Sequence, residues 1–188
     1  MEVKNSRAFP KPVHFPYMSW NDTFMELFAR CASAYQSGNF DYKNDYSTED
    51  LDFLKSIGYK HREFFDFIED YIDEQEPSPT TALLIAAARR DYFIVQQNGI
   101  ISDKTITRDD LPSFGEELDD IPYLPRILSK ARGKIKGELD PDIMFGCGGD
   151  RNFCQKNGNI ELADFLRHVW AAGDNDQKVA DWVKNCRS

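Results

Sequence analysis

The chain has 188 residues, of which 41% are hydrophobic and 13% aromatic, so it is long enough to fold around a hydrophobic core. Its formal net charge of −9 disfavours binding to nucleic acid, and no apolar stretch approaches the about 20 residues that cross a membrane. Four scattered cysteines and an N-terminus without the apolar core of a signal peptide predict a soluble, reduced, cytoplasmic protein.

The order of apolar and polar residues predicts a helical chain. We expect an extended arm over residues 1–18, where prolines are frequent. Apolar residues at helical spacing predict helices at 19–37, 48–57, 62–74 and 79–98. Residues 100–121, rich in acidic residues, proline and threonine, are interpreted as a linker. Helices are predicted again at 124–136, 150–156, 160–172 and 175–186, and glycines such as Gly38 and Gly137 follow several of them as left-handed stops.

The second set of helices repeats the first. Matching residues recur at an offset of 99 (Gly38 and Gly137) or 100 (Gly58 and Gly158, Phe65 and Phe165). A nearly constant offset is the mark of an internal duplication, which takes precedence over local propensity in predicting a fold. We therefore predict an all-α protein made of two diverged copies of a small helical unit, residues 19–99 and 122–188, joined by the burial of aromatic side chains.

Three motifs in the second copy indicate a family. They are LPR at 124–126, KAR at 130–132 with Gly137 after it, and VADWV at 179–183. This pattern resembles the bacterial DUF5069 family, a domain of unknown function with an LPR…DKARA…G pattern. Ser129 stands where the family has an acidic residue before the lysine. The resemblance implies a helical fold and a bacterial origin for the second copy, and it brings no known activity.

The helix expected at 124–136 carries a row of basic residues in an acidic protein. Arg126, Lys130 and Lys134 recur every four residues, with Arg132 and Lys136 beside them. One interpretation makes Arg126, Lys130 and Arg132 anchors for a phosphate or carboxylate ligand. The alternative is a solvated face whose charges pair with the acidic linker or with the carboxylates of the third helix.

A glycine-rich loop is expected at 140–149, before the next helix. Cys147 lies in it between Gly146 and the pair Gly148 and Gly149, whose backbone amides could line an anion or oxyanion site. Cys147 is the candidate nucleophile, with His168 as the imidazole that could activate it. The alternative is a cysteine that packs as a small apolar side chain.

Aromatic residues are concentrated in the first copy. Tyr42 and Tyr46 fall in a predicted loop and are candidates for the wall of a ligand pocket, whereas the rings at helical spacing are typical of a core. The cysteines, histidines and acidic residues lack the spacing of known metal sites, and no glycine motif for a nucleotide is present. We therefore expect neither a metal nor a cofactor.

Two functions fit these residues. The first is a small intracellular protein that binds or acts on a small anionic or aromatic molecule in a pocket between the two copies. The alternative is a helical-repeat module that binds another protein and has no catalytic activity. The sequence leaves open whether the protein is an enzyme, and it indicates neither a nucleic-acid nor a membrane partner.

Overall fold

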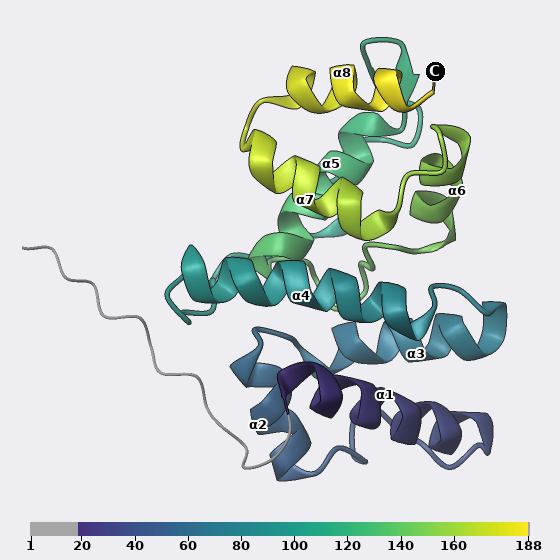
Figure 1. Cartoon of the computed structure of the whole chain (residues 1–188), viewed down its shortest axis with the longest axis vertical. Coiled ribbons are helices and arrows are strands. Elements are labelled where there is room, and N and C mark those ends of the chain that lie inside the picture. Colours follow the sequence, from purple (N-terminus) through teal and green to yellow (C-terminus); the bar gives the residue numbers. More distant parts are fainter. Residues whose placement is uncertain (1–18, 188) are drawn as a thin grey trace, which may run out of the picture.

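A computed structural model describes residues 19–187, so the predicted arm over 1–18 lies outside the described residues. The all-α prediction is confirmed, since one two-stranded hairpin accompanies the helices of the described chain (Figure 1). The elements are α1 (Trp20–Gln36), α2 (Thr48–Ser56), α3 (His61–Glu74), α4 (Pro79–Val95), η1 (Arg108–Asp110), β1 (Glu117–Leu118), β2 (Ile121–Pro122), α5 (Leu124–Lys136), α6 (Gly148–Lys156), α7 (Leu162–Ala172) and α8 (Asp176–Cys186). No helix among these is long and apolar enough to cross a membrane.

Local sequence explains where most of these helices begin and end. Ser19, Ser47 and Ser78 each cap the first turn of a helix with a side-chain oxygen that accepts a backbone N–H. Gly137 ends α5 in the left-handed conformation, with φ at 71°.

Three boundaries differ from the prediction by two residues or more. The helix α4 ends at Val95 rather than at 98, and α7 begins at Leu162 rather than at 160. The helix α6 begins at Gly148 rather than at 150, because the residues expected to close the glycine loop form its first turn.

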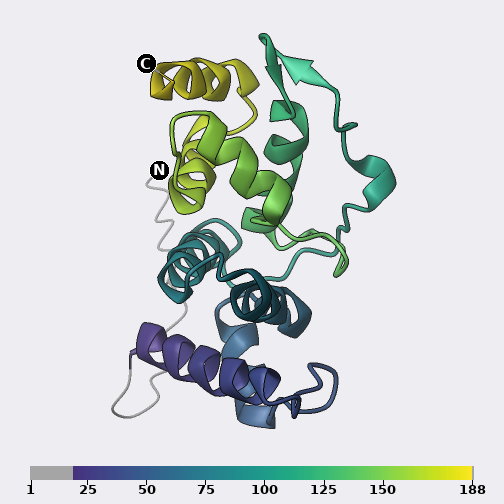
Figure 2. The ribbon, with the colours of Figure 1, turned by 90° about the vertical axis from the view of Figure 1, so that its right-hand side faces the viewer.

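The order of helices recurs along the chain. Helices of 17, 9, 14 and 17 residues in the first half are followed by helices of 13, 9, 11 and 11 residues in the second. Within each half the first helix packs on the third, α1 on α3 and α5 on α7. The two halves stack along the long axis of the molecule, with α3 and α4 between α1–α2 and α5–α8 (Figures 1 and 2).

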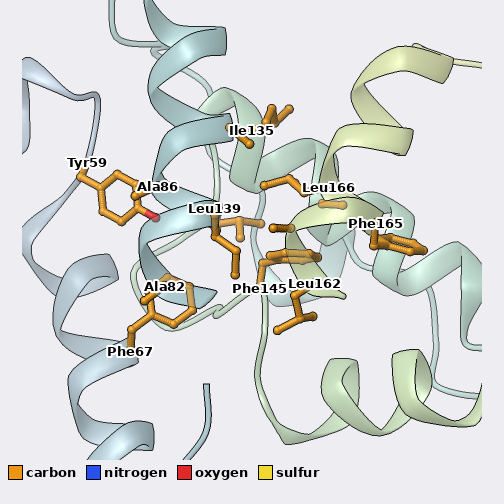
Figure 3. Close-up of a cluster of buried hydrophobic side chains, with 14 of the residues drawn as sticks. Tyr59, Phe67, Ala82, Ala86, Ile135, Leu139, Phe145, Leu162, Phe165 and Leu166 are labelled. Atoms are coloured by element: carbon orange, nitrogen blue, oxygen red, sulfur yellow. The ribbon is translucent and has the colours of Figure 1, made fainter. Parts of the chain in front are cut away.

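The interface between the halves is centred on α4, which packs against both α5 and α7. Ala82 and Ala86 of α4 are fully buried, and their small side chains allow the helices to approach closely. Figure 3 shows Phe67 beside Ala82 on one side of this interface and Phe145 and Leu162 on the other. Aromatic and aliphatic side chains together therefore form one continuous core across the interface.

Polar side chains also cross this interface. Arg89, only 1% exposed, donates from Nη1 to the carbonyl oxygen of Ile135 at 3.2 Å. Lys60 donates from Nζ to the carbonyl oxygen of Leu139 at 2.9 Å. Because a buried donor without an acceptor is costly, these bonds restrict how the two halves can be packed together.

The segment interpreted as a linker lies against the second half. Ile106 forms a parallel bridge with Leu139, its N–H donating to the carbonyl oxygen of Glu138 at 2.7 Å. β1 and β2 pair as an antiparallel hairpin directly before α5, and β1 packs on that helix. Residues 106–122 thereby cover one side of α5.

Candidate functional site

The basic residues of α5 are divided between the interior and the surface. Lys130 and Lys134 are 4% and 2% exposed, on the face that α5 turns toward the core. Nζ of Lys130 lies 2.5 Å from Oδ2 of Asp150, and Nζ of Lys134 lies 2.6 Å from Oε1 of Glu63 on α3. The interpretation of this row as a solvated face is therefore wrong for both lysines, although pairing with a third-helix carboxylate occurs at Lys134. Residues four apart share a helix face, and here that face is the buried one.

Asp150 is the central acceptor of a buried cluster. It is the third residue of α6 and has no exposed surface. Its Oδ2 accepts from Nζ of Lys130 and from the N–H of Gly146, the latter at 2.8 Å, and its Oδ1 accepts from the hydroxyl of Tyr123 at 2.8 Å. Burial, and then the charge of Asp150, raise the pKa of Tyr123, so this hydroxyl remains a donor. The carboxylate is fully satisfied and holds Lys130 and Tyr123 in place.

Cys147 shares the ammonium of Lys130. It is the N-cap residue of α6, and its Sγ accepts from Nζ of Lys130 at 3.1 Å. Its side chain is half-buried, whereas Cys31 and Cys154 are enclosed by the core, where burial raises the pKa of both thiols to about 12. A neighbouring ammonium and a helix N-terminus are the surroundings that favour a nucleophilic thiolate. Of the four cysteines, Cys147 combines these surroundings with access from solvent.

The start of α2 provides an internal comparison for the start of α6. Both helices have nine residues, with an aspartate at the third position that pairs with a basic side chain of the preceding long helix at 2.5 Å. In α2 the N-cap Ser47 and Asp50 form a capping box, and Asp50 pairs with the exposed Arg30. In α6 the N-cap side chain forms no capping hydrogen bond. The N-cap sulfur and the aspartate of α6 instead converge on one buried ammonium.

Two glycines beside Cys147 are required by the geometry. Gly146 has φ at 96°, a conformation that residues with a Cβ rarely adopt. A Cβ on Gly149 would lie 3.0 Å from the hydroxyl oxygen of Tyr123, so glycine allows Tyr123 to reach Asp150. A Cβ on Gly148 would make only ordinary contacts, with Nη2 of Arg151 at 3.7 Å and Oε2 of Glu74 at 4.0 Å, and this glycine lines the cleft described next.

A cleft of about 610 Å³ lies between the two halves, next to the first turn of α6. The α3–α4 connection, with Glu76 and Ser78, forms one wall, and residues of α6 and the α6–α7 connection, with Gly148 and Arg151, form the other. Arg151 crosses it, pairing with Asp70 at 2.8 Å, with Glu74, and with Glu76 at 3.5 Å. Because three carboxylates surround this one guanidinium, the walls are polar without an excess of positive charge.

The other two predicted anchors contact different parts of the fold. Nη1 of Arg126 donates to the carbonyl oxygen of Pro112 at 2.6 Å, and its guanidinium lies 4.1 Å above the centre of the Phe114 ring. Arg132 pairs with Asp176 at the start of α8. Of the three predicted anchors, the structure brings Lys130 to Cys147 and uses the other two to hold neighbouring segments against α5.

The remaining candidates lie on other surfaces or in the core. His168 is exposed, and its ring stacks on Trp182 of α8 with centroids 3.7 Å apart, so the polar group that contacts Cys147 is Lys130 rather than this imidazole. Tyr42 stacks on Phe65 and lines a second cavity. Tyr46 is 9% exposed and packs in the core of the first half.

Sequence reasoning missed Tyr123 and Asp150. Asp150 had a usable signal, because an acidic residue three positions after a helix N-cap usually serves the cap, and a cysteine N-cap leaves it free for another partner. Tyr123 had no such signal in the sequence, because its hydroxyl reaches Asp150 only in the folded chain. In the described part of the chain, no three His, Cys, Asp or Glu side chains are grouped so as to hold a metal ion.

No protein-family model, curated protein or solved structure matches this chain. The resemblance to the DUF5069 family therefore rests on the sequence motifs alone.

Proposed function

We propose that this chain acts as a thiol-dependent acyl-transfer enzyme, which reacts with a small polar molecule through Cys147. This cysteine directly precedes Gly148, a residue in the lining of the cleft between the halves. The observation that carries the proposal is the position of the Lys130 ammonium, 3.1 Å from Sγ of Cys147 and 2.5 Å from the buried carboxylate of Asp150. The ion pair between Lys130 and Asp150 does not require a cysteine beside it. The position of the Cys147 sulfur against this ammonium is therefore better explained by a role as nucleophile.

The reaction uses groups that are already in place. The thiolate of Cys147 attacks an acyl carbon, the S–C bond forms, and the π electrons move to the carbonyl oxygen. The N–H groups of Gly148 and Gly149 have no acceptor within the helix, because α6 begins there, and they are suited to stabilise this oxyanion. When the leaving group departs, it takes a proton from the Lys130 ammonium.

Hydrolysis then regenerates the site. The neutral Lys130 amine takes a proton from water as the water oxygen attacks the thioester, and collapse releases the acid and the Cys147 thiolate. Asp150 does not touch the reacting atoms in this scheme. It is a positioning residue that holds the Lys130 side chain beside the sulfur, and Tyr123 holds Asp150 in turn.

The walls of the cleft indicate the kind of substrate. Arg151 is neutralised by Asp70, Glu74 and Glu76, and Glu161 adds a further carboxylate to the lining. An anionic substrate would meet net repulsion there, so we propose a neutral or cationic amide or ester for this cleft. A thiol of this kind operates in its reduced form, in accordance with the cytoplasmic location that the sequence predicts.

Alkylation provides a direct test. We expect iodoacetamide at pH 7.5 to modify Cys147 at least about tenfold faster than the half-buried Cys186 of the same molecule, measured by peptide mass spectrometry. Lys130→Met should remove this advantage. Lys136→Met, which removes a charge from the same helix outside the cluster, should keep it. Equal alkylation rates at Cys147 and Cys186 in the wild type would rule out Cys147 as the nucleophile.

A second measurement examines the acyl chemistry itself. Incubation with p-nitrophenyl acetate should release one equivalent of p-nitrophenol in a burst and add an acetyl group to Cys147, and Cys147→Ser should abolish both. A fast-alkylating Cys147 that accepts no acyl group would refute acyl transfer while leaving the reactive thiol in place. A chain that is inert in both assays is better explained as the helical-repeat interaction module.

A further inference from the structure

A second cavity, of about 450 Å³, is lined by residues of the first half of the chain together with Pro141 of the second half. It shares no lining residue with the cleft beside Cys147. Its basic lining residues are Lys43, Lys55, Lys60, His61 and Arg62. None of the lining residues is Asp or Glu, although the formal net charge of the whole chain is −9. In an acidic protein, a cavity lined by one sign of charge concentrates ligands of the opposite sign.

Part of the lining of this cavity is apolar. Leu51 and Leu54 of α2, Tyr59, and Pro141 from the α5–α6 connection form it. Leu51 is 42% exposed, a large aliphatic side chain left open to solvent beside the basic groups. The cavity therefore offers an apolar surface and cationic groups to one ligand, the combination that fits a molecule with a hydrophobic body and a charged head.

The basic groups differ in how fully the fold already uses them. Arg62 pairs with Glu69 at 3.4 Å and lies 3.0 Å from Asp66, so Glu69 compensates its charge even where Asp66 is protonated. Lys60 donates one hydrogen bond to Leu139 and keeps two N–H groups. Lys43 and Lys55 are exposed and form no ion pair within the described part of the chain. These two lysines are the available charges.

We propose that this cavity binds a small organic anion, with its apolar or aromatic body on Leu51 and Pro141 and its phosphate or carboxylate against Lys55 and Lys43. Tyr42 adds an aromatic edge to the same site. The proposal does not depend on the chemistry of Cys147. It assigns the anionic ligand to the first half of the chain, away from the cleft that contains Arg151.

The test uses 1-naphthyl phosphate as the probe and isothermal titration calorimetry on the full chain. We expect one site per chain, with affinity weakened about five- to tenfold in a Lys43→Gln, Lys55→Gln double variant, because each exposed charge pair contributes up to about fivefold. A Lys104→Gln, Lys156→Gln variant carries the same change in net charge at exposed positions outside the cavity and should bind as the wild type does. Cys147→Ser should also bind unchanged.

Neutral 1-naphthol separates charge recognition from simple apolar binding. If it binds as tightly as the phosphate, or if both double variants weaken the phosphate equally, the anion site is refuted. Absence of binding at millimolar probe also refutes it. Methyl NMR locates the probe independently of any variant: the signals of Leu51 and Leu54 should shift on titration while that of Leu128, buried on α5, should not, and the opposite pattern would place the probe elsewhere.

Discussion

Replacing Lys130 by methionine tests how strongly burial governs the cluster. The substitution keeps much of the side-chain volume and removes the ammonium that lies 2.5 Å from Asp150. Side-chain exposure is 5% for Lys130 and 0% for Asp150, so the carboxylate loses a charged partner in a site that water does not reach. Removing one member of a buried ion pair costs about 3–5 kcal/mol, and the bonds from Tyr123 and Gly146 that remain place the expected loss near the lower end.

The first half of the chain supplies a matched control. Arg30 and Asp50 make a bond of the same length between α1 and α2, but the Arg30 side chain is 55% exposed. Arg30→Met should therefore cost less than about 1 kcal/mol. Adding Asp150→Asn to Lys130→Met removes the uncompensated charge and should recover about 1–2 kcal/mol of the loss.

Urea unfolding followed by far-UV circular dichroism measures the three variants and the wild type. If Lys130→Met destabilises the chain no more than Arg30→Met does, burial is not what makes the Lys130–Asp150 pair important. The same result would remove the argument that Asp150 holds Lys130 in position for Cys147.

Two further predictions concern α3 and the interface between the halves. Burial raises the pKa of Asp66 from 3.8 to about 7, so the folded chain loses stability as the pH rises from about 4 to 7. The Asp66→Asn variant lacks this carboxyl, and its free energy of unfolding should fall less over that range, by at most about 4 kcal/mol. If the unfolding free energies of Asp66→Asn and wild type differ by a constant amount from pH 4 to 8, the raised pKa of Asp66 is refuted. Gly137→Ala should destabilise the chain more than Gly38→Ala does. Both glycines have a positive φ, 71° at Gly137 and 72° at Gly38, which costs alanine about 1–2 kcal/mol. A Cβ at Gly137 would in addition lie 2.4 Å from the Arg89 guanidinium. Equal melting temperatures for the two glycine variants would show that Arg89 moves aside without cost.

Much of the helical framework followed from local signals. Apolar residues at helical spacing predicted the helices. In the structure Ser19, Ser47 and Ser78 cap three of them, because a hydroxyl before a helix can accept an N–H that has no other partner. Gly137 marked the end of α5 because glycine enters the left-handed conformation at little cost. The predicted start of α6 was wrong for a related reason. Glycine is typical of loops, and Gly148 and Gly149 were assigned to one although they form the first turn of the helix.

The sequence singled out two of the residues that meet at the candidate site. Cys147 and Lys130 were both selected, but in separate hypotheses, because a spacing of 17 residues across a helix end and a loop does not indicate a contact. Helical periodicity places Lys130 and Lys134 on one face without telling whether that face is buried. The pairing of Cys147 with His168 rested on residue type alone, and the fold places that imidazole against Trp182.

By itself, the sequence determined which segments are helical and which residues cap them, since hydrogen bonding within a turn and the freedom of glycine act over a few neighbouring positions. Only the tertiary structure decided that α5 turns two lysines inward and that Asp150 and the N-cap sulfur of α6 meet one of them. The physical reason is that burial of a charge depends on what packs over it. The groups that meet Lys130 are Cys147 and Asp150 at the start of α6, which tertiary packing rather than local sequence brings to it.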